Sequence, residues 1–184
     1  MHLKKIIIML VAALAVLAGC GTSTDQSTHN DADVAFAQGM IPHHRQAVAM
    51  SALAAGRTET PEILDLAARI GAAQGPEIDT MTAWLQEWDA ELPAGGMADM
   101  DHGGMSGMDG MMTPQQMGRL EQSTGPAFDR LFLEQMTEHH EGAVVMARTE
   151  LAQGADPDAL ALARVIVDSQ QAEIDEMADL LSRP

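Results

Sequence analysis

Two adjacent histidines flanked by methionines occur twice in the chain, and they are the residues best suited to chemistry. A single offset of 96 residues (139 − 43 = 96) relates the two copies without a gap. The residues are Met40, His43, His44 and Met50 in the first copy and Met136, His139, His140 and Met146 in the second. Imidazole nitrogen suits copper, zinc, iron and nickel, whereas thioether sulfur is soft and favours Cu(I). A mixed set therefore indicates copper more than the other metals.

Helical spacing would bring the members of each copy onto one side of a helix. At about 100° per residue, residues 40, 43, 44, 47 and 50 fall within a face of about 120°. Adjacent histidines cannot both point straight inward, so we expect one to face the bundle axis and the other its shoulder. The small side chain of Ala47 leaves room beside them for a partner helix or an ion.

A second pair of segments offers a matching face with a carboxylate on it. Its residues recur at helical spacing and are Gln74, Glu77, Ile78, Met81 and Leu85, repeated as Gln170, Glu173, Ile174, Met177 and Leu181. A buried carboxylate needs a charge, a hydrogen bond or a metal. Glu77 and Glu173 could orient an imidazole, bind the metal directly, or form a structural bond to arginine or backbone. Met81 and Met177 join the candidate metal ligands.

A glycine- and methionine-rich loop, residues 93–113, lies between the two copies. Glycine at this density cannot hold a helix or a strand. The candidate ligands in it are Met97, Met100, His102, Met105, Met108, Met111 and Met112. Thioether clusters suit Cu(I) or Ag(I), so we expect metal capture. The alternative is low-complexity sequence drift.

The methionines and histidines of the two repeats could also serve the core of the fold and bind no metal. A methionine stripe often fills a core, and a single inward histidine is more often a hydrogen-bonded core group. Paired histidines at the same place in both copies favour ligands, because the core would bear their desolvation cost twice without any packing advantage.

The elements that position these residues are predicted to be helices. Each repeat, 33–88 and 128–182, reads as two antiparallel helices joined by a short turn, and two such hairpins form a four-helix bundle. The fold prediction is therefore all-α, with one domain over residues 33–184. Pro42 requires either a kink or a helix that restarts there, and Gly75-Pro76 could bend the second helix. Thr113-Pro114 begins a short helical piece that ends near Ser123.

The N-terminus indicates export. Residues 1–20 combine a basic start, an apolar run from Ile6 to Leu17 and the sequence Leu-Ala-Gly-Cys, which resembles the lipobox of bacterial lipoproteins. The resemblance implies cleavage before Cys20 and lipid attachment to its thiol. Residues 21–32 read as a flexible tether. We therefore expect a lipoprotein anchored in the membrane at the cell surface or in the periplasm.

Composition narrows the function further. The formal net charge of −17 leaves no basic cluster for a nucleic acid. Cys20 is the only cysteine, so the fold has neither a disulfide nor a thiolate ligand.

The repeated motif Met-x-x-His-His-x-x-Ala-x-x-Met, followed by Glu77-Ile78-Asp79-Thr80-Met81 and Glu173-Ile174-Asp175-Glu176-Met177, resembles the DUF305 family over residues 33–182. This resemblance implies an exported, ferritin-like four-helix protein, and some members are associated with copper binding and copper tolerance. It extends a copper role to the paired histidines and to Met40, Met50, Met136 and Met146.

The leading hypothesis is thus an extracytoplasmic copper-binding lipoprotein that buffers, tolerates or delivers the metal, with a copper-transport protein or a second copy as possible partner. One alternative is a ferritin-like redox metalloenzyme, although such a site uses Glu-x-x-His and no such motif occurs. The other is a surface interaction module with structural histidines. The sequence contains no nucleophile–base arrangement, so we do not expect an enzyme.

Overall fold

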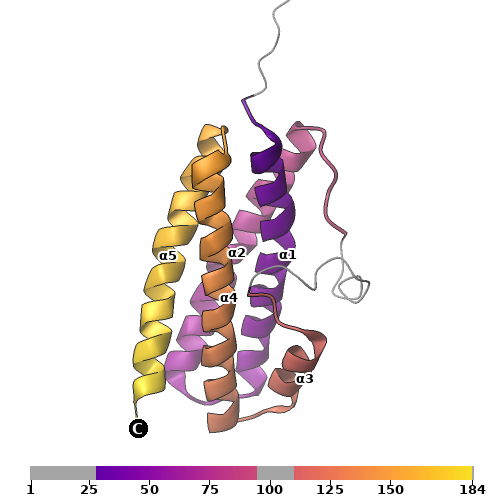
Figure 1. Cartoon of the computed structure of the whole chain (residues 1–184). Coiled ribbons are helices and arrows are strands. Elements are labelled where there is room, and N and C mark those ends of the chain that lie inside the picture. The colour runs from indigo at the N-terminus through magenta and orange to yellow at the C-terminus, as the bar shows by residue number, and fades with distance from the viewer. Residues whose placement is uncertain (1–27, 95–109, 184) are drawn as a thin grey trace, which may run out of the picture.

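The computed structural model describes residues 28–94 and 110–183, and these residues form a helical bundle. Its elements are α1 (Asp31–Leu53), the short 3₁₀ helix η1 (Ala54–Gly56), α2 (Pro61–Glu87), α3 (Pro114–Gln122), α4 (Pro126–Gln153) and α5 (Pro157–Ser182). Helices α1 and α2 form one hairpin and α4 and α5 the other, with the short α3 beside the end of the bundle (Figure 1). The prediction of an all-α bundle of two hairpins, with a short helix between them, is confirmed.

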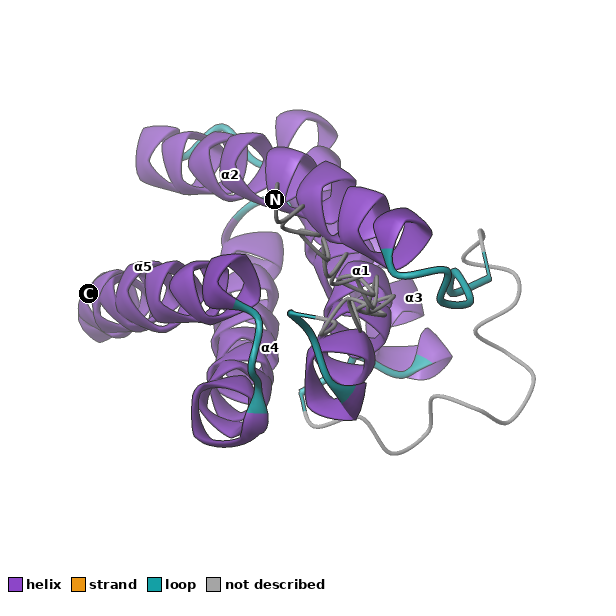
Figure 2. Cartoon of the chain, turned by 90° about the horizontal axis from the view of Figure 1, so that it is seen from above, coloured by secondary structure: helices purple, strands orange, loops and turns teal. Residues whose placement is uncertain are grey.

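The two hairpins meet through their first helices. Phe36 and Met40 in the first half of α1 share an apolar cluster with Ala143 and Ala147 in the second half of α4, so α1 and α4 run antiparallel. Figure 2 shows the bundle from above, with α1 and α2 on one side and α4 and α5 on the other. The bundle therefore brings the repeated first helices face to face.

Helix ends follow local sequence signals. Proline occupies the first position of α2, α3, α4 and α5, where its missing N–H costs nothing. The side chain of Asn30 caps α1 in a capping box with Asp33, and Thr113 does the same for α3 with Gln116. These caps explain why the helices begin where they do.

Two prolines lie inside helices without ending them. Helix α1 continues through Pro42, and α2 continues through Pro76, so the prediction that a helix could restart at Pro42 is wrong. An interior proline costs about 3 kcal/mol. Pro42 is buried, and tertiary packing over the whole helix offsets that local cost.

Residues 28–32 are the described part of the predicted tether, residues 21–32. Thr28 donates a hydrogen bond from Oγ1 to Oδ2 of Asp156 (3.1 Å), His29 stacks on Trp88 with ring centroids 4.6 Å apart, and Asn30 caps α1. The tether prediction is therefore wrong for residues 28–32, because polar side chains that bury little can still cap and cross-link. The predicted signal segment, Cys20 and residues 21–27 lie outside the described residues. Within the described ranges, no helix has the length and apolar character needed to cross a membrane.

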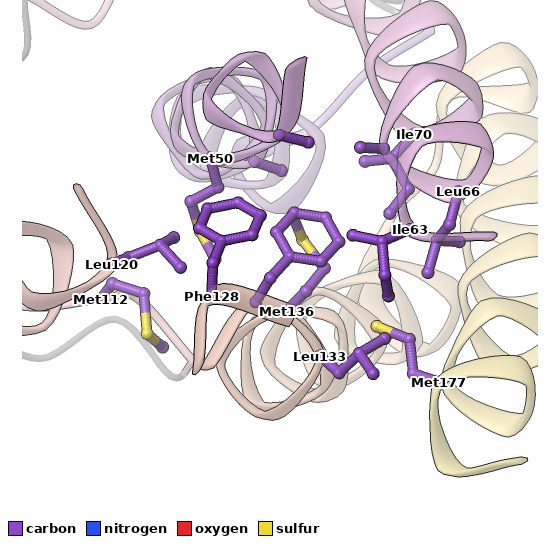
Figure 3. Close-up of a cluster of buried hydrophobic side chains, with 14 of the residues drawn as sticks. Met50, Ile63, Leu66, Ile70, Met112, Leu120, Phe128, Leu133, Met136 and Met177 are labelled. Atoms are coloured by element: carbon purple, nitrogen blue, oxygen red, sulfur yellow. The ribbon is translucent and has the colours of Figure 1, made fainter. Parts of the chain in front are cut away.

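The core divides into two apolar clusters, one at each end of the bundle. The cluster near the start of α4 includes Met50, Ile63, Phe128 and Met136, which pack together in Figure 3. The cluster at the other end contains Phe36, Met40, Ile41, Met81, Leu85, Ala143, Ala147, Ala163 and Ile166. We call them the α4-start cluster and the α1-start cluster.

Candidate functional site

A layer of polar residues crosses the bundle between the two apolar clusters. Along each long helix it falls where one cluster stops and the other begins, and each member has a counterpart 96 residues away. We call it the histidine layer, and its members are His43, His44, Gln74, Glu77, His139, His140, Gln170 and Glu173. All four imidazoles are 0% exposed. The repeat in the sequence therefore becomes one pseudo-symmetric constellation.

His43 and His139 meet at the centre of this layer. Their ring centroids are 3.7 Å apart, with an angle of 41° between the ring planes. This contact joins α1 and α4, the first helices of the two repeats, at the centre of the bundle.

His44 and His140 each bind a glutamate of their own hairpin. Nε2 of His44 lies 2.6 Å from Oε2 of Glu77, and Nε2 of His140 lies 2.7 Å from Oε2 of Glu173. Such a carboxylate holds the ring orientation and fixes which nitrogen carries the proton. With the proton on Nε2, the lone pair is on Nδ1, and Nδ1 of both histidines is buried with no hydrogen-bond partner in the described ranges. Glu77 and Glu173 therefore each bind an imidazole in this structure, and their role toward a metal stays a prediction.

Burial keeps the central imidazole uncharged. Desolvation, followed by the neighbouring imidazoles of His43, His140 and His44, holds the pKa of His139 well below its usual range. Desolvation disfavours the charged form of a histidine. His139 is therefore neutral at physiological pH, and neutral imidazole is the form that binds metals.

Gln74 and Gln170 belong to the layer, although we assigned them no role from the sequence. Both are 3% exposed, and Oε1 of each, together with Nε2 of Gln74, lacks a hydrogen-bond partner among the described residues. Leaving a buried polar atom unsatisfied costs about 1–3 kcal/mol. The available signal was a polar residue in an inward stripe, repeated at the same offset of 96 residues.

The types of side chain in the histidine layer suit a metal ion, but the present positions of the central rings do not. Within the described part of the chain, no three His, Cys, Asp or Glu side chains are arranged so that they could hold one ion. All four imidazoles are buried, and two of them are held by carboxylates, as in metal-binding histidines generally, but His43 and His139 pack ring against ring. A metal in this layer would require these rings to turn.

The candidate methionine ligands lie in the apolar clusters on either side of the layer. Met40 and Met81 belong to the α1-start cluster, against which Met146 packs while partly buried. Met50, Met136 and Met177 belong to the α4-start cluster, and Figure 3 shows the first two beside Phe128. A metal-binding role for these six methionines stays a prediction.

The methionine-rich loop is described only at its end. Met97, Met100, His102, Met105 and Met108 lie outside the described residues. Met111 is partly buried. Met112 is 4% exposed and packs near Leu120 in the α4-start cluster (Figure 3).

A buried carboxylate pair that sequence reasoning missed lies where α4 joins α5. Asp33 accepts hydrogen bonds from the backbone N–H groups of Ala155 and Asp156. Glu150 is 1% exposed, and burial, together with a hydrogen bond to Asp33, raises the pKa of Glu150 to about 8. The counterpart of Glu150 in the first repeat is Ala54, so the repeat itself gave no signal for this pair.

Comparisons with known proteins give a consistent family. The model for a domain of unknown function, DUF305, matches residues 33–181. A DUF305 protein from Streptomyces coelicolor, predicted to be secreted, is 37% identical, with a TM-score of 0.73 over 82% of this chain and 92% of that one. A DUF305 fragment from Deinococcus radiodurans is 30% identical, with a TM-score of 0.73 over 84% of this chain and 98% of the fragment.

A third similar structure carries a metal. CopM in its Cu(II)-bound form is 34% identical, with a TM-score of 0.69 over 81% of this chain and 95% of CopM. The comparison with curated proteins found no match. The family model spans most of the chain, including both halves of the histidine layer, and the chain belongs to the DUF305 family.

Proposed function

We propose that this protein is a copper-binding protein of the cell envelope, and that the histidine layer is its binding site. The observation that carries the proposal is a set of four fully buried imidazoles, two of them oriented by glutamates, at the centre of an otherwise apolar bundle. Desolvating four imidazoles is costly without a ligand. CopM, which resembles this chain, has been solved with Cu(I), Cu(II) and silver.

The residues of the layer have distinct tasks in this proposal. His44 and His140 offer Nδ1, because their Nε2 atoms face the glutamates. His43 and His139 turn out of their mutual contact to complete the set. The methionines on both sides add soft donors that favour Cu(I) over Zn²⁺. Copper is cargo here, held for buffering, tolerance or delivery, and no reaction is assigned to it.

The location follows from the N-terminal sequence. Export and lipid attachment at Cys20 would place the bundle outside the cytoplasm, where thiol ligands are prone to oxidation while imidazole and thioether ligands persist. The secretion predicted for the Streptomyces coelicolor relative agrees with export. A copper-transport protein or a second copy of the chain would receive the metal.

A competition titration tests the proposal. The purified full-length protein, in mild detergent, is titrated with Cu(I) without oxygen and with Cu(II) in air against chromophoric chelators. The test variant carries alanine at His43, His44, His139 and His140, and the matched control is His29→Ala, outside the layer. Circular dichroism and thermal unfolding verify that each variant folds.

We expect the wild type and the control to compete for copper and the four-histidine variant to lose most of its affinity. If the wild type competes no better than free histidine and methionine, copper binding is wrong. If binding survives the histidine changes and is lost when residues 97–109 are replaced by a glycine-serine linker, the loop is the site and the histidine layer is not.

A further inference from the structure

The chain segment Gly110–Met112 is fastened to the bundle at two points, and we call it the anchor segment. At one end, the side-chain amide of Gln46 on α1 pairs with the backbone of Met112. The Met112 N–H donates to Oε1 of Gln46 (2.7 Å), and Nε2 of Gln46 donates to the Met112 carbonyl (2.9 Å). Gln46 is 2% exposed, so both bonds form away from water, where an unmade bond is costly.

The other end lies flat against α4. Gly110 has a φ of +81°, and a Cβ built on it would lie 2.6 Å from the carbonyl oxygen of Glu138 and 3.0 Å from that of His139. The same Cβ would lie 3.0 Å from the Cα of Gly142. Only glycine combines this φ with so close an approach to another backbone. The anchor segment therefore contacts the helical turn that carries His139.

The two attachment points occupy equivalent positions in the two repeats. Gln46 follows His43 by three residues, Gly142 follows His139 by three residues, and 142 − 46 = 96. The repeat is thus broken at one position of the inward face. The first copy provides Gln46, whose side chain binds the Met112 backbone. The second copy provides Gly142, which has no side chain and so lets Gly110 approach α4 closely. This asymmetry fits a segment that lies across the α1–α4 contact, one turn from the central imidazoles.

Met111 lies between these two fixed points, and it is the one anchor residue that could bring a soft donor there. Its neighbour Met112 is buried in the α4-start cluster, whereas Met111 is partly exposed. We infer that the Met111 thioether is a transfer ligand that passes a soft metal ion to the histidine layer, and that Gln46 is the residue that positions it. This inference rests on the proposed function.

The chemistry of the transfer is a ligand exchange without a redox step. A Cu(I) or Ag(I) ion held by thioether sulfur gains an imidazole nitrogen and then loses the sulfur, so its oxidation state does not change. A donor fixed beside the receiving site acts at a high effective concentration, which falls when the attachment is loosened. Met111 and Gln46 should therefore control the rate at which the metal reaches the histidine layer. The four imidazoles should control how much metal the layer holds at equilibrium.

The experiment measures rate and equilibrium separately, with Ag(I) as a redox-inert probe. Full-length protein with ¹⁵N-labelled histidine receives Ag(I) from a thioether chelator, and the imidazole nitrogen resonances report its arrival in the histidine layer. The test variants are Met111→Leu and Gln46→Leu. The matched controls are Met117→Leu, a buried methionine of α3, and Gln135→Leu, a buried glutamine that bonds a backbone carbonyl of α3.

We expect Met111→Leu and Gln46→Leu to slow loading by roughly fivefold or more, with the final occupancy unchanged and both controls loading at the wild-type rate. Loading by Met111→Leu at the wild-type rate, or faster, overturns the inference. Leucine conserves the volume of methionine, so this variant tests the inference even if Gln46→Leu fails to fold. If Ag(I) does not alter the imidazole resonances of the wild type, the proposed function fails instead.

Discussion

At the scale of single residues, two glutamates hold two of the four imidazoles of the histidine layer in place. Glu77 and Glu173 are 16% and 15% exposed, while the imidazoles that they bind are fully buried. Each carboxylate therefore keeps some contact with water and reaches inward to hold a ring. This arrangement lowers the cost of a buried charge while it orients a buried imidazole.

Replacing these carboxylates by amides tests the orienting role. In Glu77→Gln and in Glu173→Gln, the negative charge that raises imidazole basicity is lost, so we expect copper affinity to fall by about 10- to 100-fold. Chelator competition measures the change, with Glu87→Gln, an exposed glutamate of α2, as the control. Unchanged affinity in both layer variants would show that the carboxylates serve only the fold.

At the scale of elements, the start of each repeat binds the start of the second helix of the other repeat. Asp33 at the start of α1 accepts the N–H of Asp156, which caps α5, and Asp129 at the start of α4 accepts a hydrogen bond from Thr60 before α2 (2.6 Å). These cross-repeat bonds hold the hairpins in register. Glu150 adds to the first junction a carboxyl group that the second junction lacks.

The Glu150 junction should make stability depend on pH. In the folded chain the pKa of Glu150 is raised to about 8 from an ordinary value of 4.5, so between these values the unfolded state releases a proton that the folded state keeps. The free energy of unfolding therefore falls as the pH rises through this window. His139, whose pKa is lowered from 6.5, has the opposite effect below that value. Asp33, whose pKa is lowered from 3.8, acts only in more acidic solution.

Denaturant unfolding between about pH 6.5 and pH 8.5 isolates the contribution of Glu150. We expect the wild type to lose stability across this range and Glu150→Gln, which keeps a neutral donor to Asp33, to remain flat. At the upper end the variant should be more stable by about 1–3 kcal/mol. The exposed Glu141→Gln is the control. A variant that declines as steeply as the wild type would contradict the assignment.

At the same junction, the neighbouring carboxylates leave no space for a side chain at Gly154. A Cβ there would collide with Oε1 of Glu150 and lie 2.9 Å from Oδ1 of Asp33, so Gly154→Ala should reduce the free energy of unfolding by about 1–3 kcal/mol. At Gly56 an added Cβ meets nothing within 4 Å, and Gly56→Ala should be neutral or slightly stabilising. Equal stability of the two variants, measured by urea unfolding, would contradict this packing.

At the scale of the whole molecule, the bundle carries a layer of buried polar residues across its middle. A layer of eight polar residues separates two apolar clusters that could otherwise be continuous. Several of its buried atoms lack partners in the described ranges, including Nδ1 of His44 and His140 and both polar atoms of Gln74. Proteins commonly trade stability for a functional site in this way.

Replacing His43 and His139 by leucine tests whether the histidine layer lowers the stability of the metal-free fold. The double variant His43→Leu/His139→Leu removes two buried imidazoles from an apolar surrounding, so without metal it should be more stable than the wild type by about 1–2 kcal/mol. Copper at about 100 times its dissociation constant should stabilise the wild type by about 2.7 kcal/mol and leave the variant unchanged. Thermal unfolding with and without copper measures both. A variant less stable than the metal-free wild type would indicate a structural role for the pair.

The sequence by itself determined the helices, their pairing into two hairpins and the repeat that joins them. Apolar residues at helical spacing, proline at helix starts and the offset of 96 residues are local or periodic signals, and they also located the paired histidines and Glu77. Only the tertiary structure decided which groups meet, namely the His43 ring with the His139 ring, the Gln46 side chain with the Met112 backbone, and Asp33 with Glu150. The last two contacts arise where the repeats differ. Because packing between distant segments creates them, no periodicity within one repeat could have indicated them.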